Sequence, residues 1–274
     1  MSLDYDALNF AGTEDYRKTA RKVITYPGTE TVTWYGFTRH NFEVDGHQAF
    51  IVEPPNPAPG LPWSWCVQWA ESFVPRTPAL KLLERGFHHV YIDVFSTYFN
   101  QEGIAVVEKF YQLLQSLGFY RQAALIGMSY GGLFSLRWAA EHPETVAAIY
   151  LDAPVCTLGF GYISKFAQNR EFFAEEAKKR AAAYGTTPEK LSSHPLSPLN
   201  NSHPIAEAKI PIYCIRSGQD QSVDPEENID IFAQRFREAG GEIEILDRPL
   251  FGHHPHGLDD PAPLVDFILK NYPF

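Results

Sequence analysis

The stretch Ala123-Ala124-Leu125-Ile126-Gly127-Met128-Ser129-Tyr130-Gly131-Gly132 decides the fold class. The apolar run up to Gly127 predicts a buried strand, and the pattern over residues 131–141 predicts a helix that begins at once. Ser129 lies at the turn between them, with glycines two positions before and two positions after it. Those glycines relieve crowding where the chain turns back, so the Ser129 hydroxyl is expected above the end of a sheet.

Ser129 therefore has the surroundings that a catalytic nucleophile needs. A serine hydroxyl is a weak nucleophile unless a base lies beside it. The backbone N–H of Tyr130 begins the predicted helix, where it can stabilise an oxyanion. Gly-x-Ser-x-Gly also occurs in ordinary turns, but the strand before it and the helix after it are the context that the mechanism requires. We predict Ser129 as nucleophile and Tyr130 as one oxyanion donor.

The rest of the chain alternates apolar runs with helical patterns, which is typical of βαβ crossovers. Strands are expected at 32–37, 47–52, 63–69, 87–94, 123–127, 147–152, 210–215 and 242–246. Helices are expected at 78–85, 104–117, 131–141, 226–239 and 263–270. The first two strands read as an antiparallel hairpin. We predict an α/β fold: a mostly parallel, eight-stranded sheet with helices on both faces.

One long interval lacks a strand pattern. Between Cys156 and Lys209 the chain has an aromatic, glycine-containing start, a charged helix at 171–184 and a loop-rich end. A long insertion at one point of a compact sheet usually forms a lid or a binding loop. We predict a single domain over residues 1–274, with a cap insertion at about 157–209.

Composition limits the partners and the compartment. The chain has 274 residues, with 23 Lys and Arg against 33 Asp and Glu, for a net charge of -10. An acidic surface disfavours nucleic acid and anionic membranes. No basic and apolar leader and no apolar stretch of about 20 residues is present, which predicts a cytoplasmic protein, although a leader removed earlier would leave the same pattern. No pattern indicates an oligomeric state. Three scattered cysteines are expected to be buried thiols: Cys66, Cys156 and Cys214.

Partners for Ser129 are expected in the chain order serine, acid, histidine. Asp220 and Asp224 follow the predicted strand at 210–215. Asp220 is preferred because it lies nearer the strand end, whereas Asp224 stands directly before a proline and a helix, the position of an N-cap. Asp152, which ends an earlier strand, is a third candidate acid for which a structural role is expected.

Three histidines follow the last predicted strand: His253, His254 and His256. His253 is preferred as the general base because it lies nearest the strand end, while the other two are expected to line the site or to lie on a surface loop. A zinc site is the alternative interpretation, since histidine is a common zinc ligand. No further His, Cys and carboxylate cluster has the spacing to complete one, so neither a metal nor an organic cofactor is expected.

The second oxyanion donor is expected from the loop at residues 69–73, after the third strand. The backbone N–H of Ala70 is preferred, with Glu71 as the alternative. A Glu71 carboxylate beside a developing oxyanion would be unfavourable unless it points away or is paired. Six aromatic residues are candidates for stacking on a substrate or for packing alone: Trp69, Phe73, Tyr98, Phe99, Phe160 and Tyr162.

From about residue 31 onward, the chain resembles the α/β-hydrolase superfamily and, more narrowly, a little-characterised group of bacterial single-domain serine hydrolases. The matching runs are Pro62-Trp63-Ser64-Trp65, 86–94, 127–132, 152–156, 240–243 and Gly252-His253-His254-Pro255-His256. The resemblance implies that Ser129, Asp220 and His253 are nucleophile, acid and base.

Two departures from that group concern the predicted site. Its members carry a Gly-His-Glu-Pro-like oxyanion loop, where this chain has Ala70-Glu71-Ser72-Phe73. They often carry arginine after the serine, where this chain has Tyr130. Because both changes are at the predicted site, the substrate preference of the group is not carried over.

These features predict a serine hydrolase, with a small carboxylic ester such as an acylated sugar as substrate and partner. An acyltransferase or a carbon–carbon bond hydrolase would use the same triad. A non-catalytic ligand-binding protein on the same fold is the alternative from a different class. A complete set of Ser129, Asp220 and His253 argues against it, because binding alone does not require all three.

Overall fold

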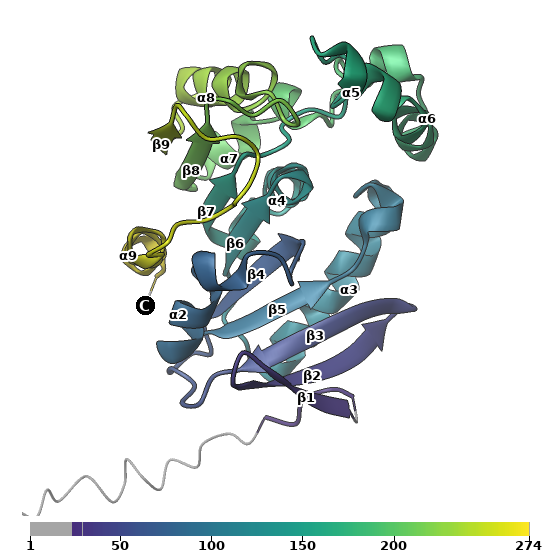
Figure 1. Cartoon of the computed structure of the whole chain (residues 1–274). Helices are drawn as coiled ribbons and strands as arrows, with labels where there is room; N and C mark the ends of the chain where they lie inside the picture. Colours follow the sequence, from purple (N-terminus) through teal and green to yellow (C-terminus); the bar gives the residue numbers. More distant parts are fainter. Residues whose placement is uncertain (1–23, 29, 274) are drawn as a thin grey trace, which may run out of the picture.

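A mixed sheet runs through the computed structural model, which describes residues 24–28 and 30–273 (Figure 1). Within those residues the sheet has nine strands, in the order β1-β2-β3-β5-β4-β6-β7-β8-β9. Pairs among β4 to β9 are parallel, and the pairs that join β1, β2, β3 and β5 are antiparallel. The strands are β1 (Glu30–Trp34), β2 (Phe37–Val44), β3 (His47–Glu53), β4 (Trp63–Gln68), β5 (His88–Ile92), β6 (Ala123–Met128), β7 (Val146–Asp152), β8 (Ile212–Ser217) and β9 (Ile243–Arg248). The prediction of a mostly parallel α/β sheet is confirmed.

The predicted number of eight strands is wrong by one, because the residues between the expected strands at 32–37 and 47–52 form a further strand, β2, which lies between β1 and β3 and pairs with both, so the two expected strands do not form a hairpin with each other. The chain reverses at Tyr35 and Gly36, which have φ of 48° and 88°, so Trp34 pairs with Phe37 across the turn. Two successive residues with positive φ are the geometry of a tight hairpin turn whose twist matches the sheet. The sequence prediction missed β2 because most of its residues are polar and only partly buried, so they lack the apolar pattern of a core strand.

Helices cover both faces of the sheet, as predicted (Figure 1). Leu125 and Ile126 are neighbours in β6, and strand geometry directs them to opposite faces. Leu125 packs in the cluster that includes α3, α4 and α8, and Ile126 packs in the cluster that includes α2 and α9. The helices are α2 (Ala79–Glu84), α3 (Gln101–Leu117), α4 (Tyr130–Glu141), α5 (Ala167–Phe172), α6 (Ala174–Ala183), α7 (His203–Glu207), α8 (Ile229–Glu238) and α9 (Ala262–Asn271).

The interval between β7 and β8 contains α5, α6 and α7 and, in the described chain, no strand, as the sequence predicts. Figure 1 shows α5 and α6 at the end of the molecule toward which β6, β7 and β8 point. The carboxyl ends of parallel strands are where α/β folds place their ligands. The insertion therefore lies on the side of the sheet where a site is expected.

Two further expectations concern the whole chain. The three cysteines are free and buried, as predicted. In the part of the chain that the structure describes, no helix combines the length and apolar character needed to cross a membrane.

Two adjacent histidines of β5 are buried in the core. The His89 ring lies 2.9 Å from Ser64 Oγ, and the His88 ring lies 2.9 Å from the Tyr26 hydroxyl. Burial lowers the pKa of His89 to about 3 and the pKa of His88 to about 4. Both side chains are therefore neutral in the folded chain at pH values where an unfolded histidine is protonated.

We expect the free energy of unfolding to fall as the pH drops from 7 to 5. The unfolded histidines have a pKa of about 6.5, so below it the unfolded chain takes up protons that the folded chain cannot, and each histidine destabilises the fold by about 2 kcal/mol at pH 5. Urea unfolding at the two pH values measures the loss. Replacing His89 by Gln should reduce the pH dependence, and replacing the exposed His203 by Gln should not. Equal stability of the unmodified chain at both pH values would contradict the interpretation.

Candidate active site

Ser129 lies in the tight turn between β6 and α4, with φ of 50° and ψ of -119°. L-residues rarely adopt this conformation, and the surrounding structure must hold it. The Ser129 N–H donates to the Asp152 carbonyl at 2.9 Å, and the Ser129 carbonyl accepts from Gly132 N and Val155 N, each at 2.9 Å. The neighbouring strand β7 and the segment after it thus fix the backbone that presents the serine hydroxyl.

The glycines of this turn are not equally constrained. A Cβ on Gly127 would lie 2.8 Å from the Gly131 carbonyl oxygen, and a Cβ on Gly132 would collide with Pro154. A Cβ on Gly131 would meet its nearest neighbours, atoms of Gln68, at an ordinary 3.5 Å. Close packing therefore requires glycine at 127 and 132, whereas the sequence argument gave equal weight to 127 and 131.

The structure brings Ser129, Asp220 and His253 together from three separate loops. His253 Nε2 lies 3.1 Å from Ser129 Oγ, and His253 Nδ1 lies 2.6 Å from Asp220 Oδ2. The other Asp220 oxygen accepts from the backbone N–H groups of Ser222 and Val223, each at 2.8 Å. Asp220 is only 3% exposed. The carboxylate is thus held in one orientation, which in turn orients the imidazole toward the serine.

Asp224, the second candidate acid, is placed elsewhere. Its Oδ1 accepts from Glu226 N at 2.9 Å at the start of a short 3-10 helix, as expected of an N-cap. Its Oδ2 lies 2.6 Å from the Lys165 ammonium group. Both oxygens are therefore engaged away from His253.

Asp152, the third candidate acid, is fully buried and holds the loop that carries the histidines. Its Oδ1 lies 2.8 Å from His256 Nδ1, and its Oδ2 accepts from Gly257 N at 2.7 Å and from the Tyr150 hydroxyl at 2.8 Å. His256 is only 3% exposed, so it is not a surface residue. The expected structural role of Asp152 agrees with these contacts, but its partner His256 did not follow from the sequence.

The loop after β4 lies beside the Ser129 turn. Gln68, the last residue of β4, is in register with Gly127, and Trp69 then turns the chain with φ of 66°. Ala70, which follows, is buried. On the other side, Tyr130 is the first residue of α4, so its N–H has no acceptor within the helix. The two predicted oxyanion donors thus come from adjacent strand ends.

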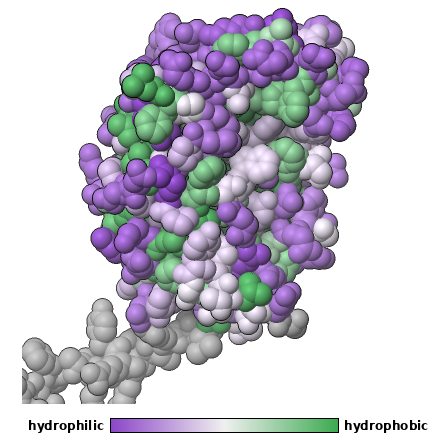
Figure 2. All heavy atoms as spheres, viewed as in Figure 1, coloured by the Kyte–Doolittle hydropathy of each residue, from purple (hydrophilic) through white to green (hydrophobic). Residues whose placement is uncertain are grey.

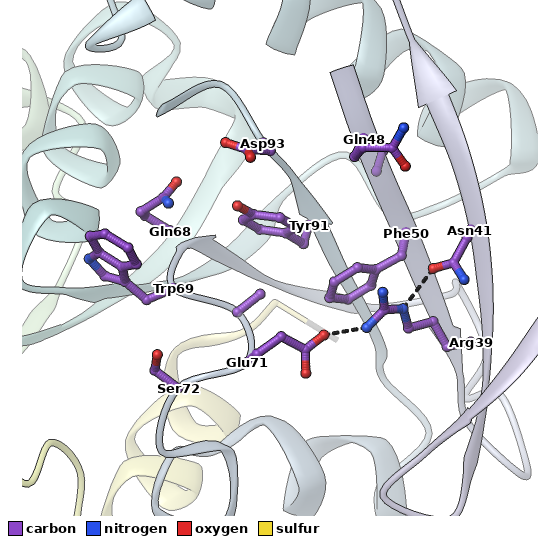
Figure 3. Close-up of a pocket in the computed structure, with 12 residues that line it drawn as sticks. Arg39, Asn41, Gln48, Phe50, Gln68, Trp69, Glu71, Ser72, Tyr91 and Asp93 are labelled. Atoms are coloured by element: carbon purple, nitrogen blue, oxygen red, sulfur yellow. Dashed lines mark hydrogen bonds and ion pairs between the residues drawn. The ribbon is translucent and has the colours of Figure 1, made fainter. Parts of the chain in front are cut away.

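Glu71 is paired, so its negative charge is offset. Its carboxylate forms an ion pair with Arg39 and accepts from Trp34 Nε1 at 2.9 Å. Figure 3 shows the Glu71 side chain directed at Arg39 and away from Trp69. The guanidinium of Arg39 also stacks over the Phe50 ring, 4.1 Å from its centroid. The expectation that Glu71 must point away or be paired is therefore met.

Two cavities open beside Ser129 and His253. The first has a volume of about 340 Å³ and a mainly aromatic lining of Trp69, Phe95, Tyr130, Phe160 and Phe173, with Glu176, Ser222 and Val223. The second has a volume of about 290 Å³ and is lined by Trp69, Ser72, Phe73, His254 and His256. Trp69 lines both, so it separates an apolar side of the site from a more polar side. It also borders a third, polar hollow around Arg39 and Asp93 (Figure 3).

The six predicted aromatic residues divide into two groups. Trp69, Phe73 and Phe160 line the cavities beside Ser129. The other three pack or bond elsewhere: Phe99 is buried against Phe134, Tyr98 donates to Glu176, and Tyr162 donates to Glu189.

Arg180 of α6 is a residue of the site that the sequence did not indicate. It is fully buried, and its guanidinium donates to the carbonyls of Leu158 and Phe160, each at 2.6 Å, and to the Tyr130 hydroxyl. Burial raises the pKa of Tyr130, which keeps the phenol protonated. Arg180 thereby ties the insertion to the residue after Ser129. Its neighbours Lys178 and Lys179 are exposed, and the sequence alone did not distinguish it from them.

The comparisons with known proteins agree with this geometry. The family model described as alpha/beta hydrolase fold matches residues 34–199. The chain belongs to the alpha/beta hydrolase fold family. No curated protein sequence is significantly similar to this hydrolase-fold chain.

Solved structures share the fold at low sequence identity. A puromycin-hydrolyzing peptidase of Mycobacterium tuberculosis matches with a TM-score of 0.62 and 16% identity, over 85% of this chain and 38% of that one. A putative dipeptidyl aminopeptidase IV from Bacteroides ovatus matches with a TM-score of 0.60 and 16% identity, over 90% and 36%. The acylaminoacyl peptidase of Pyrococcus horikoshii matches with a TM-score of 0.55 and 14% identity, over 90% and 40%. This hydrolase-fold chain thus spans about two fifths of the length of the structures that it matches.

Replacing Asp220 by Asn should lower kcat by about 10³- to 10⁴-fold, because the neutral amide no longer stabilises the imidazolium or holds the required tautomer of His253. Replacing Asp224 by Asn is the matched control. It removes an N-cap charge and an ion pair with Lys165, so it should lower the thermal midpoint while kcat stays within a few-fold. Steady-state kinetics on any substrate that the chain hydrolyses measures both. Equal losses of kcat in the two variants would contradict the assignment of the acid.

Proposed function

We propose that this chain is a serine hydrolase that cleaves carboxylic esters of small molecules through an acyl-enzyme. The observation that carries the proposal is the simultaneous contact of His253 with Ser129 Oγ and with the buried Asp220. A nucleophile, a base within hydrogen-bond reach and a third group that orients the base are the signature of covalent acyl transfer.

The proposed reaction begins with proton transfer from Ser129 Oγ to His253 Nε2 as Oγ attacks the ester carbonyl carbon. The backbone N–H groups of Tyr130 and Ala70 stabilise the negative charge that develops on the carbonyl oxygen. His253 then returns the proton to the departing alkoxide, which leaves the acyl group on Ser129. Water attacks the acyl-enzyme with His253 again as base. Asp220 remains ionised throughout and stabilises the imidazolium.

The two cavities suggest how such an ester is divided across Ser129. The aromatic cavity bounded by Phe160 and Phe173 suits an apolar acyl group, because burial of apolar surface favours binding there. The cavity bounded by Ser72 and His254 offers hydrogen-bonding groups to the alcohol part, such as a sugar hydroxyl. We further propose that residues 157–209 cap the site within one domain, since α5 and α6 flank the aromatic cavity.

Cleavage of an amide is the second candidate function. It is suggested by the peptidases among the solved structures of similar fold. The same three residues would act, with His253 giving its proton to a leaving amine. The two functions differ in the leaving group, so paired substrates that share one acyl group distinguish them.

The unmodified chain should hydrolyse p-nitrophenyl esters faster than p-nitroanilides that carry the same acyl group. Replacing Ser129 by Ala should abolish both activities, and replacing the exposed Ser116 of α3 by Ala should leave them unchanged. Faster turnover of the anilide would favour the amide function. Activity that persists when Ser129 is replaced, or no activity on either series, would contradict the proposed hydrolase.

Replacing Phe173 by Ala should shift the preference toward longer acyl chains. Phe173 borders the aromatic cavity and packs on Phe160 with ring centroids 4.8 Å apart, so its removal deepens the cavity. Replacing the adjacent Phe172 by Ala is the matched control, because that side chain is 77% exposed. The measurement is kcat/KM over p-nitrophenyl esters of increasing chain length. An unchanged optimum in the Phe173 variant would show that the acyl group binds elsewhere.

A further inference from the structure

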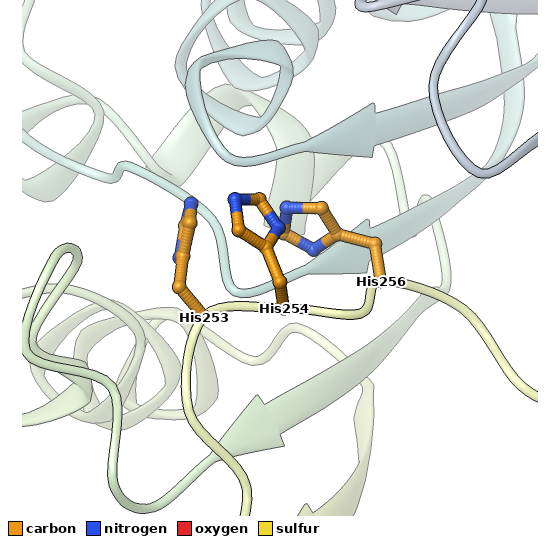
Figure 4. A group of neighbouring side chains, drawn as sticks. All are labelled: His253, His254 and His256. Carbon is orange, nitrogen blue, oxygen red and sulfur yellow. The ribbon is translucent and has the colours of Figure 1, made fainter.

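Three imidazoles converge beside Ser129 on a single loop. His253, His254 and His256 each place a ring nitrogen so that the three atoms lie within 4.8 Å of one another. The ring centroids are 4.7 to 5.0 Å apart. Figure 4 shows the ring of His254 between the other two. The proposed reaction needs only His253, so the other two rings have no assigned role in it.

Two of the three rings are oriented as metal-binding histidines usually are. His253 Nδ1 contacts Asp220 at 2.6 Å, and His256 Nδ1 contacts Asp152 at 2.8 Å. A carboxylate that accepts from one ring nitrogen leaves the other nitrogen with a free lone pair, which is the arrangement found behind zinc ligands. His256 Nε2 has no hydrogen-bond partner among the residues that the structure describes, and His256 lines the cavity beside Ser129.

We propose that His253 Nε2, His254 and His256 Nε2 reversibly bind one divalent transition-metal ion such as Zn²⁺. Three imidazoles and a water molecule complete a tetrahedral zinc site. The buried carboxylate of Asp220 favours a cation there, whereas the charge of Asp152 is partly offset by the Arg248 guanidinium 3.7 Å away. The ion is a reversible ligand of the site, and the ester chemistry does not require it.

The geometry makes metal binding and the contact with Ser129 mutually exclusive. Zinc–nitrogen bonds of about 2.0 to 2.1 Å place tetrahedral ligand atoms about 3.4 Å apart, so the three nitrogens must move closer than they lie now. His254 is exposed and meets the other two histidine rings edgewise, so its side chain can rotate inward in exchange for its stacking contact with Phe73, whose ring centroid lies 5.3 Å away. His253 Nε2 must exchange Ser129 Oγ, now at 3.1 Å, for the ion.

This exchange makes the ion an inhibitor, and that part of the inference rests on the proposed function. A nitrogen that donates its lone pair to a metal cannot accept the Ser129 proton. A metal ion bound by this loop therefore blocks His253, the general base of the proposed reaction. No metal site was expected from the sequence because no further cluster completes one, whereas the proposed site uses the three histidines and a water molecule.

Direct binding is tested on the Ser129→Ala chain, in which His253 Nε2 has lost its contact with the serine hydroxyl. This measurement does not depend on catalytic activity. Titration with Co²⁺, followed by the visible absorption of the bound ion, should give one ion per chain. Adding His254→Ala should weaken the affinity at least tenfold, and adding His203→Ala, which removes an exposed histidine of α7, should not change it. The absence of binding, or equal affinity with and without His254, would overturn the proposal.

Inhibition is tested by the rate at which a fluorophosphonate labels the chelator-treated, unmodified chain. Zn²⁺ should slow labelling at least tenfold, the chelator should restore it, and His254→Ala should raise the Zn²⁺ concentration for half inhibition at least tenfold. Labelling that Zn²⁺ leaves unchanged would overturn the inhibitory role. A chain that never labels would reject the proposed hydrolase, and the Co²⁺ titration would still decide the metal site.

Discussion

The backbone of Ser129 is held at φ of 50° by hydrogen bonds from β7 and the residues after it, and the site is arranged around this strained turn. The turn is possible because Gly127 and Gly132 leave no side chain where the Gly131 carbonyl and Pro154 already lie. It sets the serine hydroxyl above the sheet and directs the first N–H of α4 toward the same point. A strained backbone conformation lowers the stability of the fold, and such conformations are found mainly at functional sites, where the surrounding packing holds them.

The orientation of His253 depends on a second set of buried contacts, made by two carboxylates. Asp220 and Asp152 end up on either side of the histidine loop, one on His253 and one on His256, although they follow different strands. Asp152 also contributes its backbone carbonyl to the Ser129 turn. Asp152 therefore links the position of Ser129 to the position of the histidine loop. The same double anchoring turns two Nε2 atoms toward one cavity, which is why the loop is suited to a metal ion as well as to proton transfer.

Much of this arrangement could be predicted from local sequence because its signals are local. The strand–turn–helix around Ser129, the order of Asp220 and His253, and the N-cap position of Asp224 each follow from a few adjacent residues. The strand β2 was overlooked because its residues are mostly polar and only partly buried. Arg180 was not found because burial of one arginine on a charged helix is decided by what packs on it from elsewhere in the chain.

Contacts between distant segments were likewise outside the reach of the sequence. His256 is separated from Asp152 by about a hundred residues, and no pattern announces their pairing. The pairing of Glu71 with Arg39 across the sheet is of the same kind. No sequence motif indicates either pairing, and both hold side chains in place around the site. They fix charged side chains around the site, which the Gly-x-Ser-x-Gly stretch does not determine.

We propose that Ser129 is a nucleophile and that His253 activates it. Mass spectrometry of peptides from the chain, after reaction with an organophosphonate, tests it most directly. A single adduct is expected on the peptide that contains Ser129, and it should form far more slowly when His253 is replaced by Gln. An adduct on another residue, or an unchanged rate in the His253 variant, would contradict it.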